Sequence, residues 1–343
     1  YNVIKIFQKT GYKLDDSIED EIESIILDSS KSPDLKIGGE VGNRLYSKTA
    51  VKDYINHVVS TAATRFDGLK IALDCANGSA SVCAKEIFTA LGAKCYMLSD
   101  TPDGTNINDG CGSTHPEELM RFVKDAGLDL GLAFDGDADR MLAVDENGEL
   151  VDGDKVIAIC AKNMKEEGRL AKDTAVVTVM SNMGFFKFCE DNGIKCAKTA
   201  VGDRYVLEKM LKDGYNIGGE QSGHVIFLDY ATTGDGELSG VQLVQTVVKS
   251  GKKLSELAKI MSVYPQVLIN VKVSAEGKQK YNNDEYIIAA TQKAEMELMG
   301  DGRVLVRVSG TEPLVRVMLE GKDIEHITRL GNEIAQVVKE RLS

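Results

Sequence analysis

The central part of the chain alternates short apolar runs with segments whose apolar residues recur at helical spacing. Short apolar runs predict strands, and the amphipathic segments between them predict helices. The expected order is a helix at 50–65, a strand at 70–74, a helix that follows the loop 76–79 and ends near Leu91, a strand at 93–98, a helix at 117–125 and a strand at 128–134. Because strands alternate with helices, the pattern predicts a parallel or mixed α/β sheet.

A second segment, which continues to about residue 263, echoes the first. A strand at 175–179 leads into a helix, and residues 192–196 (NGIKC) then resemble residues 91–95 (LGAKC). This similarity suggests an internal repeat. The helices within the two segments differ in length, so the similarity does not fix the bounds of the repeat. Apparent strands at 215–217 and 225–228 follow in this segment.

The two ends of the chain differ from its centre. Beyond Tyr264 the order becomes strand, helix, strand, strand, helix, which is typical of a small α+β domain. Residues 1–48 supply one short apolar run and one acidic helix at 15–28, too little to bury a core. We therefore expect an α/β protein of successive α/β/α mixed-sheet units, followed by a small α+β domain. The expected parts are a remnant of a first α/β domain at 1–48, a second α/β domain at 49–152, a third at 153–263 and the α+β domain at 264–343.

Charge and composition narrow the functions that this fold could serve. The 343 residues carry a formal net charge of −12, so general binding to nucleic acid or an anionic membrane is not expected, although a local basic pocket for phosphates is compatible with it. No apolar run approaches the roughly 18 residues that cross a bilayer. The seven cysteines include no Cys-x-x-Cys pair, which disfavours a zinc site and favours reduced thiols in the cytoplasm.

The strongest chemical signal is the sequence DGDADR at 135–140, called the acidic loop below, which directly follows an apolar strand. Asp135, Asp137 and Asp139 would repel one another without a divalent cation between them, and carboxylate oxygens suit Mg²⁺. Gly136 allows the backbone to fold tightly enough to direct all three inward. Arg140 adds a fixed positive charge that suits a phosphate.

Two other interpretations of the acidic loop stay open. A calcium loop would have Glu146 at its twelfth position, but it requires glycine where Arg140 stands and helices where strands are expected. A solvated acidic turn needs no ligand, but ordinary turns seldom hold three aspartates straight after an apolar strand. Ligands usually bind at strand ends in α/β sheets, which favours the metal interpretation.

The second signal is the sequence GGEQSGH at 218–224, called the histidine loop below, which lies between two apparent strands. Its glycines let the backbone approach a ligand, Glu220 and Ser222 suit sugar hydroxyls, and His224 can titrate near neutral pH. The alternative is a glycine-rich hairpin turn with incidental polar residues.

The third signal is the sequence RVSGTEP at 307–313 with Arg316 beyond it, called the arginine loop below. Two hydroxyls, a glycine and flanking arginines at a strand end can form a phosphate site in which backbone N–H groups and guanidinium groups share the anion. A plain hairpin turn is again the alternative. No Walker-type or Gly-x-Gly-x-x-Gly motif supports nucleotide binding. Three such loops in successive units predict one cleft built from several domains.

These motifs resemble those of the α-D-phosphohexomutases across the whole chain, most of all the phosphoglucosamine mutases. The resemblance implies a Mg²⁺ cofactor and a role for residues of each loop. The implied metal ligands are Asp135, Asp137 and Asp139, and the implied catalytic residues are Lys5, Arg140 and His224. The implied substrate-binding residues are Asp203, Arg204, Glu220, Ser222, Arg307, Ser309, Gly310, Thr311 and Arg316.

The resemblance also implies a substrate and a reaction. Gln221 and the sequence GSTHP at 112–116 favour the branch that acts on glucosamine phosphates. The implied reaction interconverts glucosamine 6-phosphate and glucosamine 1-phosphate through a phosphoserine and a bisphosphate, as part of cytoplasmic amino-sugar and cell-wall precursor synthesis. The implied partner is a phosphosugar, with no nucleic acid and no membrane, and a homodimer is a further expectation.

The main departure from the family concerns the nucleophile. The family's serine lies in a Ser-His-Asn-Pro sequence, which these 343 residues do not contain. The opening residues YNVIK resemble a family segment just beyond that serine, with Val3 in place of a glycine and Lys5 on a family lysine. We therefore expect the sequence to begin inside a longer protein, past the nucleophile, and to lack mutase turnover by itself. Ser113 is not expected to substitute, because the family fills this position too.

Two alternatives to a phosphoglucosamine mutase remain. The same chemistry serves phosphomannomutases and phosphoglucomutases, which differ in the hexose. A non-catalytic fragment that only binds phosphosugars is the other alternative.

Overall fold

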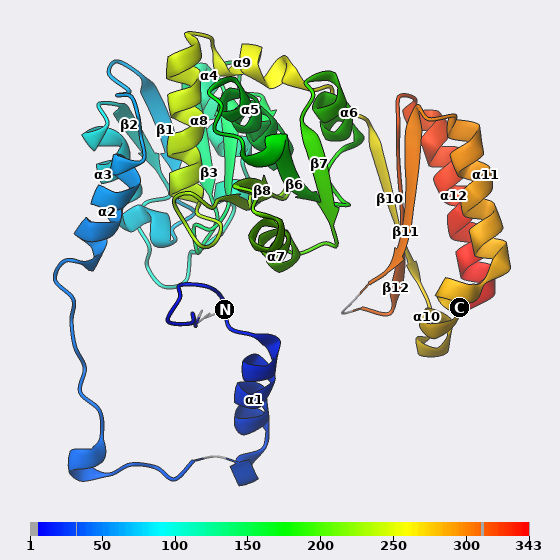
Figure 1. Ribbon diagram of the computed structural model, residues 1–343, viewed down its shortest axis with the longest axis horizontal. Helices are drawn as coiled ribbons and strands as arrows, with labels where there is room; N and C mark the ends of the chain where they lie inside the picture. Colours follow the sequence, from blue (N-terminus) through cyan, green and yellow to red (C-terminus); the bar gives the residue numbers. More distant parts are fainter. Residues whose placement is uncertain (1–5, 32, 310–311, 343) are drawn as a thin grey trace. The chain divides into compact units, whose positions relative to one another are not determined.

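The computed structural model describes residues 6–31, 33–309 and 312–342 (Figure 1). The chain divides into two compact units. The N-terminal unit consists of Tyr1–Met180 and Ile194–Lys259, and the C-terminal unit consists of Ser181–Gly193 and Ile260–Ser343. No helix in the described part of the chain combines the length and the apolar character that a bilayer crossing demands.

The first sheet of the N-terminal unit has the strand order β2-β1-β3-β4-β5. Strand β1 (Lys70–Asp74) lies parallel to both β2 (Lys94–Leu98) and β3 (Leu130–Phe134), whereas β4 (Met141–Asp145) is antiparallel to β3 and to β5 (Leu150–Val151). Every residue of β3 and β4 is buried, which explains why their sequences read as continuous apolar runs. Helices α3 (Ala84–Ala90) and α4 (Glu117–Asp125) connect the parallel strands.

The second sheet repeats the order and direction of strands β2, β1, β3 and β4 of the first. It runs β7-β6-β8-β9, with β6 (Thr174–Thr178) parallel to β7 (Lys195–Thr199) and β8 (Ile217–Gly219), and β9 (Val225–Phe227) antiparallel to β8. The acidic loop joins β3 to β4, and the histidine loop joins β8 to β9. The two loops therefore occupy equivalent positions in two copies of one supersecondary pattern.

Helices cover these sheets, and one of them, α8 (Gly236–Ser250), packs against β3, β4 and β9. Nearly all of α8 is buried, which fits its low content of charge. Further helices of this unit are α2 (Ala50–Ser60), α5 (Gly153–Glu166), α7 (Asp203–Asp213) and α9 (Leu254–Leu257). The helix predicted at 50–65 thus ends five residues early, because the chain turns to bury Phe66, whose N–H donates to Leu91 O at 2.7 Å.

The C-terminal unit is built on an antiparallel sheet of order β10-β12-β11. Its strands are β10 (Gln266–Lys272), β11 (Gly302–Val308) and β12 (Leu314–Gly321). Helices α11 (Glu285–Leu298) and α12 (Ile324–Leu342) lie along one face of this sheet (Figure 1) and share its apolar core. A short helix that the sequence pattern did not predict, α10 (Ala275–Lys280), begins where Ser274 Oγ accepts from Gly277 N–H.

Helix α6 (Met183–Asp191) belongs to the C-terminal unit although the chain enters it directly from β6. The carboxylate of Glu320, which is fully buried, accepts from Met183 N–H at 2.9 Å and from Arg303 Nε at 2.6 Å. A second guanidinium nitrogen of Arg303 donates to Ser181 O at 2.6 Å. This buried ion pair fixes α6 to strands β11 and β12.

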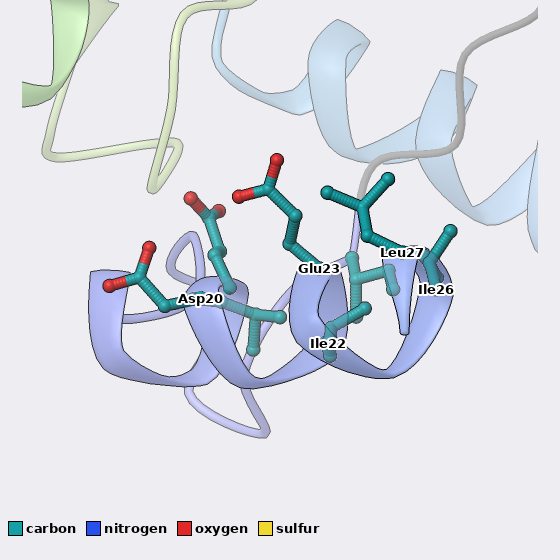
Figure 2. A pocket seen from close by; sticks show the side chains of 8 residues that line it. Asp20, Ile22, Glu23, Ile26 and Leu27 are labelled. Atoms are coloured by element: carbon teal, nitrogen blue, oxygen red, sulfur yellow. The ribbon is translucent and has the colours of Figure 1, made fainter. Parts of the chain in front are cut away.

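The N-terminal segment contains helix α1 (Asp16–Leu27) and a tight turn closed by a bridge between Phe7 and Lys13. One face of α1 lines an open hollow of about 520 Å³ (Figure 2), to which acidic side chains such as Asp20 and Glu23 and apolar ones such as Ile26 and Leu27 contribute. Short 3₁₀ helices complete the described chain at Ser29–Lys31, Gly38–Glu40, Ser79–Val82, Gly112–Thr114, Ala171–Asp173, Ala258–Ile260 and Tyr281–Asn283. The predicted fold class, mixed-sheet α/β units followed by a small α+β domain, is confirmed.

Candidate functional site

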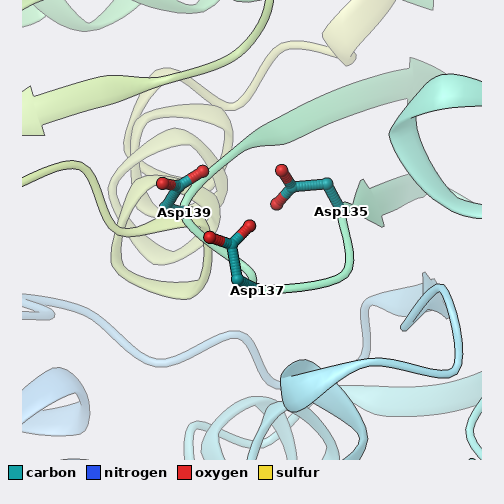
Figure 3. A group of neighbouring side chains, drawn as sticks. All are labelled: Asp135, Asp137 and Asp139. Carbon is teal, nitrogen blue, oxygen red and sulfur yellow. The ribbon is translucent and has the colours of Figure 1, made fainter. Parts of the chain in front are cut away.

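The three aspartates of the acidic loop converge. One carboxylate oxygen each of Asp135, Asp137 and Asp139 lies within 4.8 Å of the other two. Figure 3 shows the three side chains directed toward a common space at the end of the strand. Two backbone donors shape the loop around Asp135, because Ala138 N–H donates to its carbonyl at 3.0 Å and Arg140 N–H donates to its Oδ1 at 3.1 Å.

Neighbouring backbone holds the acidic loop from two sides. On one side, Ser79 N–H donates to Gly136 O at 3.0 Å, and Gly78 lies so close to Gly136 that any side chain would collide with its carbonyl. On the other side, Gly236 N–H donates to Ala138 O at 2.9 Å. Ala138 has a φ of +58°, a left-handed conformation that costs a non-glycine residue about 1 kcal/mol and persists only under such constraint.

The carboxylates of the acidic loop fit a divalent cation. Burial, followed by the charges of Asp139 and Asp137, raises the pKa of Asp135 to about 6, so the bare cluster disfavours full ionisation. A cation reverses this preference. Oxygen ligands at about 2.1 Å from Mg²⁺ lie at most about 4.2 Å apart, so a small inward rotation of the side chains would complete the coordination.

His224 lies against these carboxylates and is almost fully buried. Its Nε2 lies 3.4 Å from Asp203 Oδ2 and 3.9 Å from Asp139 Oδ2. Within the described residues, neither ring nitrogen has a hydrogen-bond partner. Burial lowers the pKa of His224 although the two carboxylates oppose this effect, so the neutral imidazole is favoured. A buried imidazole that makes no hydrogen bond is costly, so His224 is available to bond a ligand group that enters the site.

Lys13 is a residue of this site that sequence reasoning missed. Its ammonium pairs with Asp203 Oδ2, at the first residue of α7, and Thr232 Oγ1 donates to the neighbouring Gly11 O at 2.6 Å. These two contacts attach the turn at residues 7–13 to the second sheet's loops. Burial alone would raise the pKa of Asp203, but Lys13 and His224 lower it on balance. No short motif signals this contact, which joins residues 190 positions apart.

The other residues of the histidine loop have defined partners. Glu220 Oε1 accepts from Gly202 N–H at 3.0 Å, which joins this loop to the start of α7. Gln221 Nε2 donates to Oδ2 of Asp152, the N-cap residue of α5, at 3.1 Å, and Ser222 is exposed. Met141 N–H donates to Gly223 O at 3.1 Å, so the histidine loop rests on the residue that follows the acidic loop.

Two predicted arginines flank these loops. Arg140 is partly exposed, with NH1 3.8 Å from Asp135 Oδ2, so most of its guanidinium remains available to an anion. Arg204 lies on α7, where its Nε donates to Glu208 Oε1 at 2.9 Å. The structure therefore brings Arg140, Asp203 and His224 together with the three aspartates inside the N-terminal unit.

The arginine loop belongs to the C-terminal unit. Arg307 and Arg316 face each other across β11 and β12, and burial together with Arg316 lowers the pKa of Arg307. Among the described residues, the buried Nε of Arg316 has no acceptor, while its NH2 donates to Glu312 at 2.9 Å. Opposed like charges are unfavourable unless an anion lies between them. Ser309 is buried beside this pair. The predicted site residues Lys5, Gly310 and Thr311 lie outside the described residues.

Sequence models of three domains match this chain in succession. Residues 52–148 match the alpha/beta/alpha domain II of phosphoglucomutase/phosphomannomutase, residues 152–264 match its alpha/beta/alpha domain III, and residues 268–337 match its C-terminal domain.

Close relatives carry one consistent name. The phosphoglucosamine mutase of Acetivibrio thermocellus is 52% identical over 342 residues, and that of Clostridium acetobutylicum is 53% identical over 341 residues. The alignments cover 100% and 99% of this chain, and 76% of each relative.

Solved structures share the fold at low identity. A phosphoglucomutase/phosphomannomutase family protein of Burkholderia thailandensis superposes with a TM-score of 0.77 at 21% identity, covering 96% of this chain and 71% of that protein. The N-acetylphosphoglucosamine mutase of Aspergillus fumigatus, solved with GlcNAc-6P and magnesium, gives a TM-score of 0.68 at 20% identity and covers 85% and 65%. With three domain models matched along it and relatives above 50% identity, the chain belongs to the phosphoglucomutase/phosphomannomutase family.

Proposed function

We propose that this chain carries the metal-binding and substrate-binding machinery of a phosphoglucosamine mutase, which interconverts glucosamine 6-phosphate and glucosamine 1-phosphate. The observation that carries the proposal is the convergence of three carboxylates beside a buried histidine whose ring nitrogens make no hydrogen bond to any described residue. Relatives above 50% identity support the choice of the amino sugar over other hexoses.

In this proposal Asp135, Asp137 and Asp139 hold Mg²⁺. A bound Mg²⁺ supplies positive charge that offsets the negative charge of a phosphoryl group during transfer. Arg140 adds a fixed charge on the same side, where its exposed guanidinium can donate to phosphate oxygens. The loop backbone keeps these groups in position before the substrate arrives, which reduces the rearrangement needed during the reaction.

His224 is the proposed proton acceptor. Its neutral imidazole offers one nitrogen that can take the proton of a sugar hydroxyl as that oxygen attacks a phosphoryl group. Asp203, 3.4 Å away, stabilises the imidazolium that results. Glu220 and Ser222 are the proposed partners of further sugar hydroxyls, and Arg204 is the proposed contact at the start of α7.

Arg307, Ser309 and Arg316, with Gly310 and Thr311, are the proposed binding site for the phosphate that does not react. Two observations support this assignment: Arg307 and Arg316 are directly opposed in the register of β11 and β12, and the Nε of Arg316 has no acceptor in the part of the chain that the structure describes. Lys5 is proposed to assist proton transfer, as the family motif implies.

We also propose the division of the chain at 1–48, 49–152, 153–263 and 264–343, which the matched domain models at 52–148, 152–264 and 268–337 support. A cytoplasmic location and a homodimer stay predictions of the family resemblance. Sedimentation at micromolar concentration tests the dimer, which predicts twice the mass of one chain.

Binding measurements test the proposed function on the chain as it is, because these 343 residues lack the family's Ser-His-Asn-Pro sequence. Calorimetry would compare glucosamine 6-phosphate, glucose 6-phosphate and mannose 6-phosphate, each with and without Mg²⁺. We expect Mg²⁺ to bind, and glucosamine 6-phosphate to bind more tightly than the other two sugars. Asp137→Asn should weaken Mg²⁺ binding by at least about tenfold, since it removes one ligand charge.

Each contrary outcome identifies a different error. Preference for mannose or glucose phosphate would overturn the amino-sugar assignment while leaving the family chemistry intact. Binding of phosphosugars without any effect of Asp137→Asn would favour the non-catalytic alternative. Failure of both Mg²⁺ and phosphosugars to bind would refute the proposed function.

A further inference from the structure

A second cluster of polar side chains lies behind the acidic loop, in the N-terminal unit. The hydroxyl of Tyr54, on α2, lies 2.9 Å and 3.0 Å from the two carboxylate oxygens of Asp235 and 2.8 Å from Glu237 Oε2. The thiol of Cys83 lies 3.2 Å from Glu237 Oε1. The four side chains line a cavity of about 350 Å³ that Asp137 and Asp139 also line.

If both carboxyl groups were ionised, the cluster would offer too few hydrogen-bond donors for its carboxylate oxygens. A tyrosine hydroxyl donates one proton and cannot serve two carboxylates at once. Burial raises the pKa of both carboxyl groups, that of Glu237 to about 7, so Glu237 holds a proton below about pH 7. Glu237 then donates to the Tyr54 oxygen, and Tyr54 donates to Asp235. This arrangement satisfies the buried groups without leaving two charges side by side.

The cluster is connected to the acidic loop through one turn of helix. Asp235 caps α8, since its Oδ1 accepts from Leu238 N–H at 2.9 Å, and Glu237 lies in the same first turn. Between them, Gly236 donates its N–H to Ala138 O. A Cβ at Gly236 would lie 2.6 Å from Arg140 O and 2.9 Å from Ala138 O, so the helix start and the loop backbone are in direct contact.

We propose that Tyr54 is a positioning residue for the metal site, which holds the first turn of α8 against the acidic loop and so keeps the three aspartates converged. The inference rests on the proposed function, because it assumes that Asp135, Asp137 and Asp139 bind the metal. Tyr54 itself touches neither metal nor substrate. Its hydroxyl bonds to Asp235 and Glu237, which flank Gly236 in the first turn of α8. Gly236 N–H in turn donates to Ala138 O in the acidic loop.

The effect of removing the hydroxyl should be moderate. Partners that directly support metal ligands typically contribute about 10–100-fold to metal affinity, and Tyr54 acts one contact further away. We therefore expect Tyr54→Phe to weaken Mg²⁺ binding about three- to tenfold. The aromatic ring remains in place, so the packing of α2 is preserved.

The experiment measures Mg²⁺ affinity by competition with Mn²⁺, whose electron paramagnetic resonance signal falls when the ion binds. The variants are Tyr54→Phe, Gly236→Ala and the double variant, beside the unaltered chain. Tyr281→Phe is the matched control, because it also removes a hydroxyl, which donates to Val306 O at 2.6 Å in the C-terminal unit. Thermal unfolding of each variant is recorded in parallel.

If Tyr54 acts on the metal site through α8, the effect of Tyr54→Phe on Mg²⁺ affinity should depend on whether Gly236 is intact. Gly236→Ala should separate the helix start from the loop, so adding Tyr54→Phe to it should weaken Mg²⁺ binding little further. A purely structural loss of stability would instead act equally in both backgrounds. If Gly236→Ala does not fold, Asp235→Ala takes its place, because it removes the carboxylate that joins Tyr54 to the first turn of α8, and adding Tyr54→Phe to it should again weaken Mg²⁺ binding little further.

The outcomes separate this inference from the proposed function. Equal Mg²⁺ affinity for the unaltered chain, Tyr54→Phe and Tyr281→Phe would overturn the role of Tyr54 and leave the metal site intact. The same applies if Tyr54→Phe and Gly236→Ala act additively. Failure of the unaltered chain to bind Mn²⁺ would overturn the proposed function itself.

Discussion

Replacement of Glu237 by glutamine should remove a pH dependence from the stability of the N-terminal unit. Glu237 is only 3% exposed, and burial raises its pKa from 4.5 to about 7. The folded state therefore holds a proton that the unfolded state releases above about pH 4.5. The stability that this group contributes is fully present below pH 4.5, declines as the pH rises, and is lost above about pH 7.

The magnitude follows from the two pKa values. At about 1.36 kcal/mol per pH unit, the difference between 4.5 and about 7 corresponds to roughly 3 kcal/mol of unfolding free energy. Glutamine has nearly the same shape and does not titrate. The unfolding free energy of Glu237→Gln, relative to the unaltered chain, should therefore rise by roughly 3 kcal/mol between pH 4.5 and pH 8.

Hydrogen exchange of the α8 amides reports the free energy of opening in this unit, after correction for the intrinsic exchange rate at each pH. Glu256→Gln is the control, because Glu256 is an exposed carboxyl on α9 and its substitution leaves the buried cluster unaltered. A difference between Glu237→Gln and the unaltered chain that stays constant from pH 4.5 to 8 would refute the reasoning. A difference that falls with rising pH would show that Glu237 is ionised in the folded state.

Three further predictions test other contacts. Gly236→Ala should lower Mg²⁺ affinity about tenfold or more in calorimetry, because its Cβ would lie 2.6 Å from Arg140 O; unchanged affinity would show that the loop adapts. Lys13→Met should speed hydrogen exchange of residues 7–13 by removing the ion pair to Asp203, and equal rates would assign that pair no anchoring role. Arg303→Met leaves Glu320 buried without its cation and should destabilise the C-terminal unit by about 3–5 kcal/mol in urea unfolding, whereas a loss below about 1 kcal/mol would contradict the buried ion pair.

Elements with a clear local pattern were predicted well from the sequence. The strand at Lys70–Asp74 and the helix at Glu117–Asp125 have the predicted bounds. The helix at 50–65 was overestimated, because burial of Phe66 is a tertiary event that helical spacing does not report. Gly218 was predicted to lie in a loop but lies within β8, where its close approach to Val176 O leaves no room for a side chain.

The candidate site divides in the same way between local and distant contacts. The sequence predicts the convergence of Asp135, Asp137 and Asp139, because the three residues lie close together in the chain. Tyr54 and Asp235 are 181 positions apart, and only the packing of α2 against α8 makes them partners. Such long-range contacts carry no periodicity or spacing that a single sequence reveals.

The central claim is that the acidic loop binds one divalent cation. The most direct test is a crystal of this chain soaked in Mn²⁺, with anomalous scattering used to locate the ion. The account predicts one anomalous peak between Asp135, Asp137 and Asp139, about 2.2 Å from an oxygen of each, and its loss in Asp137→Asn. A crystal without a peak at these carboxylates, or with the same peak in the variant, would contradict it.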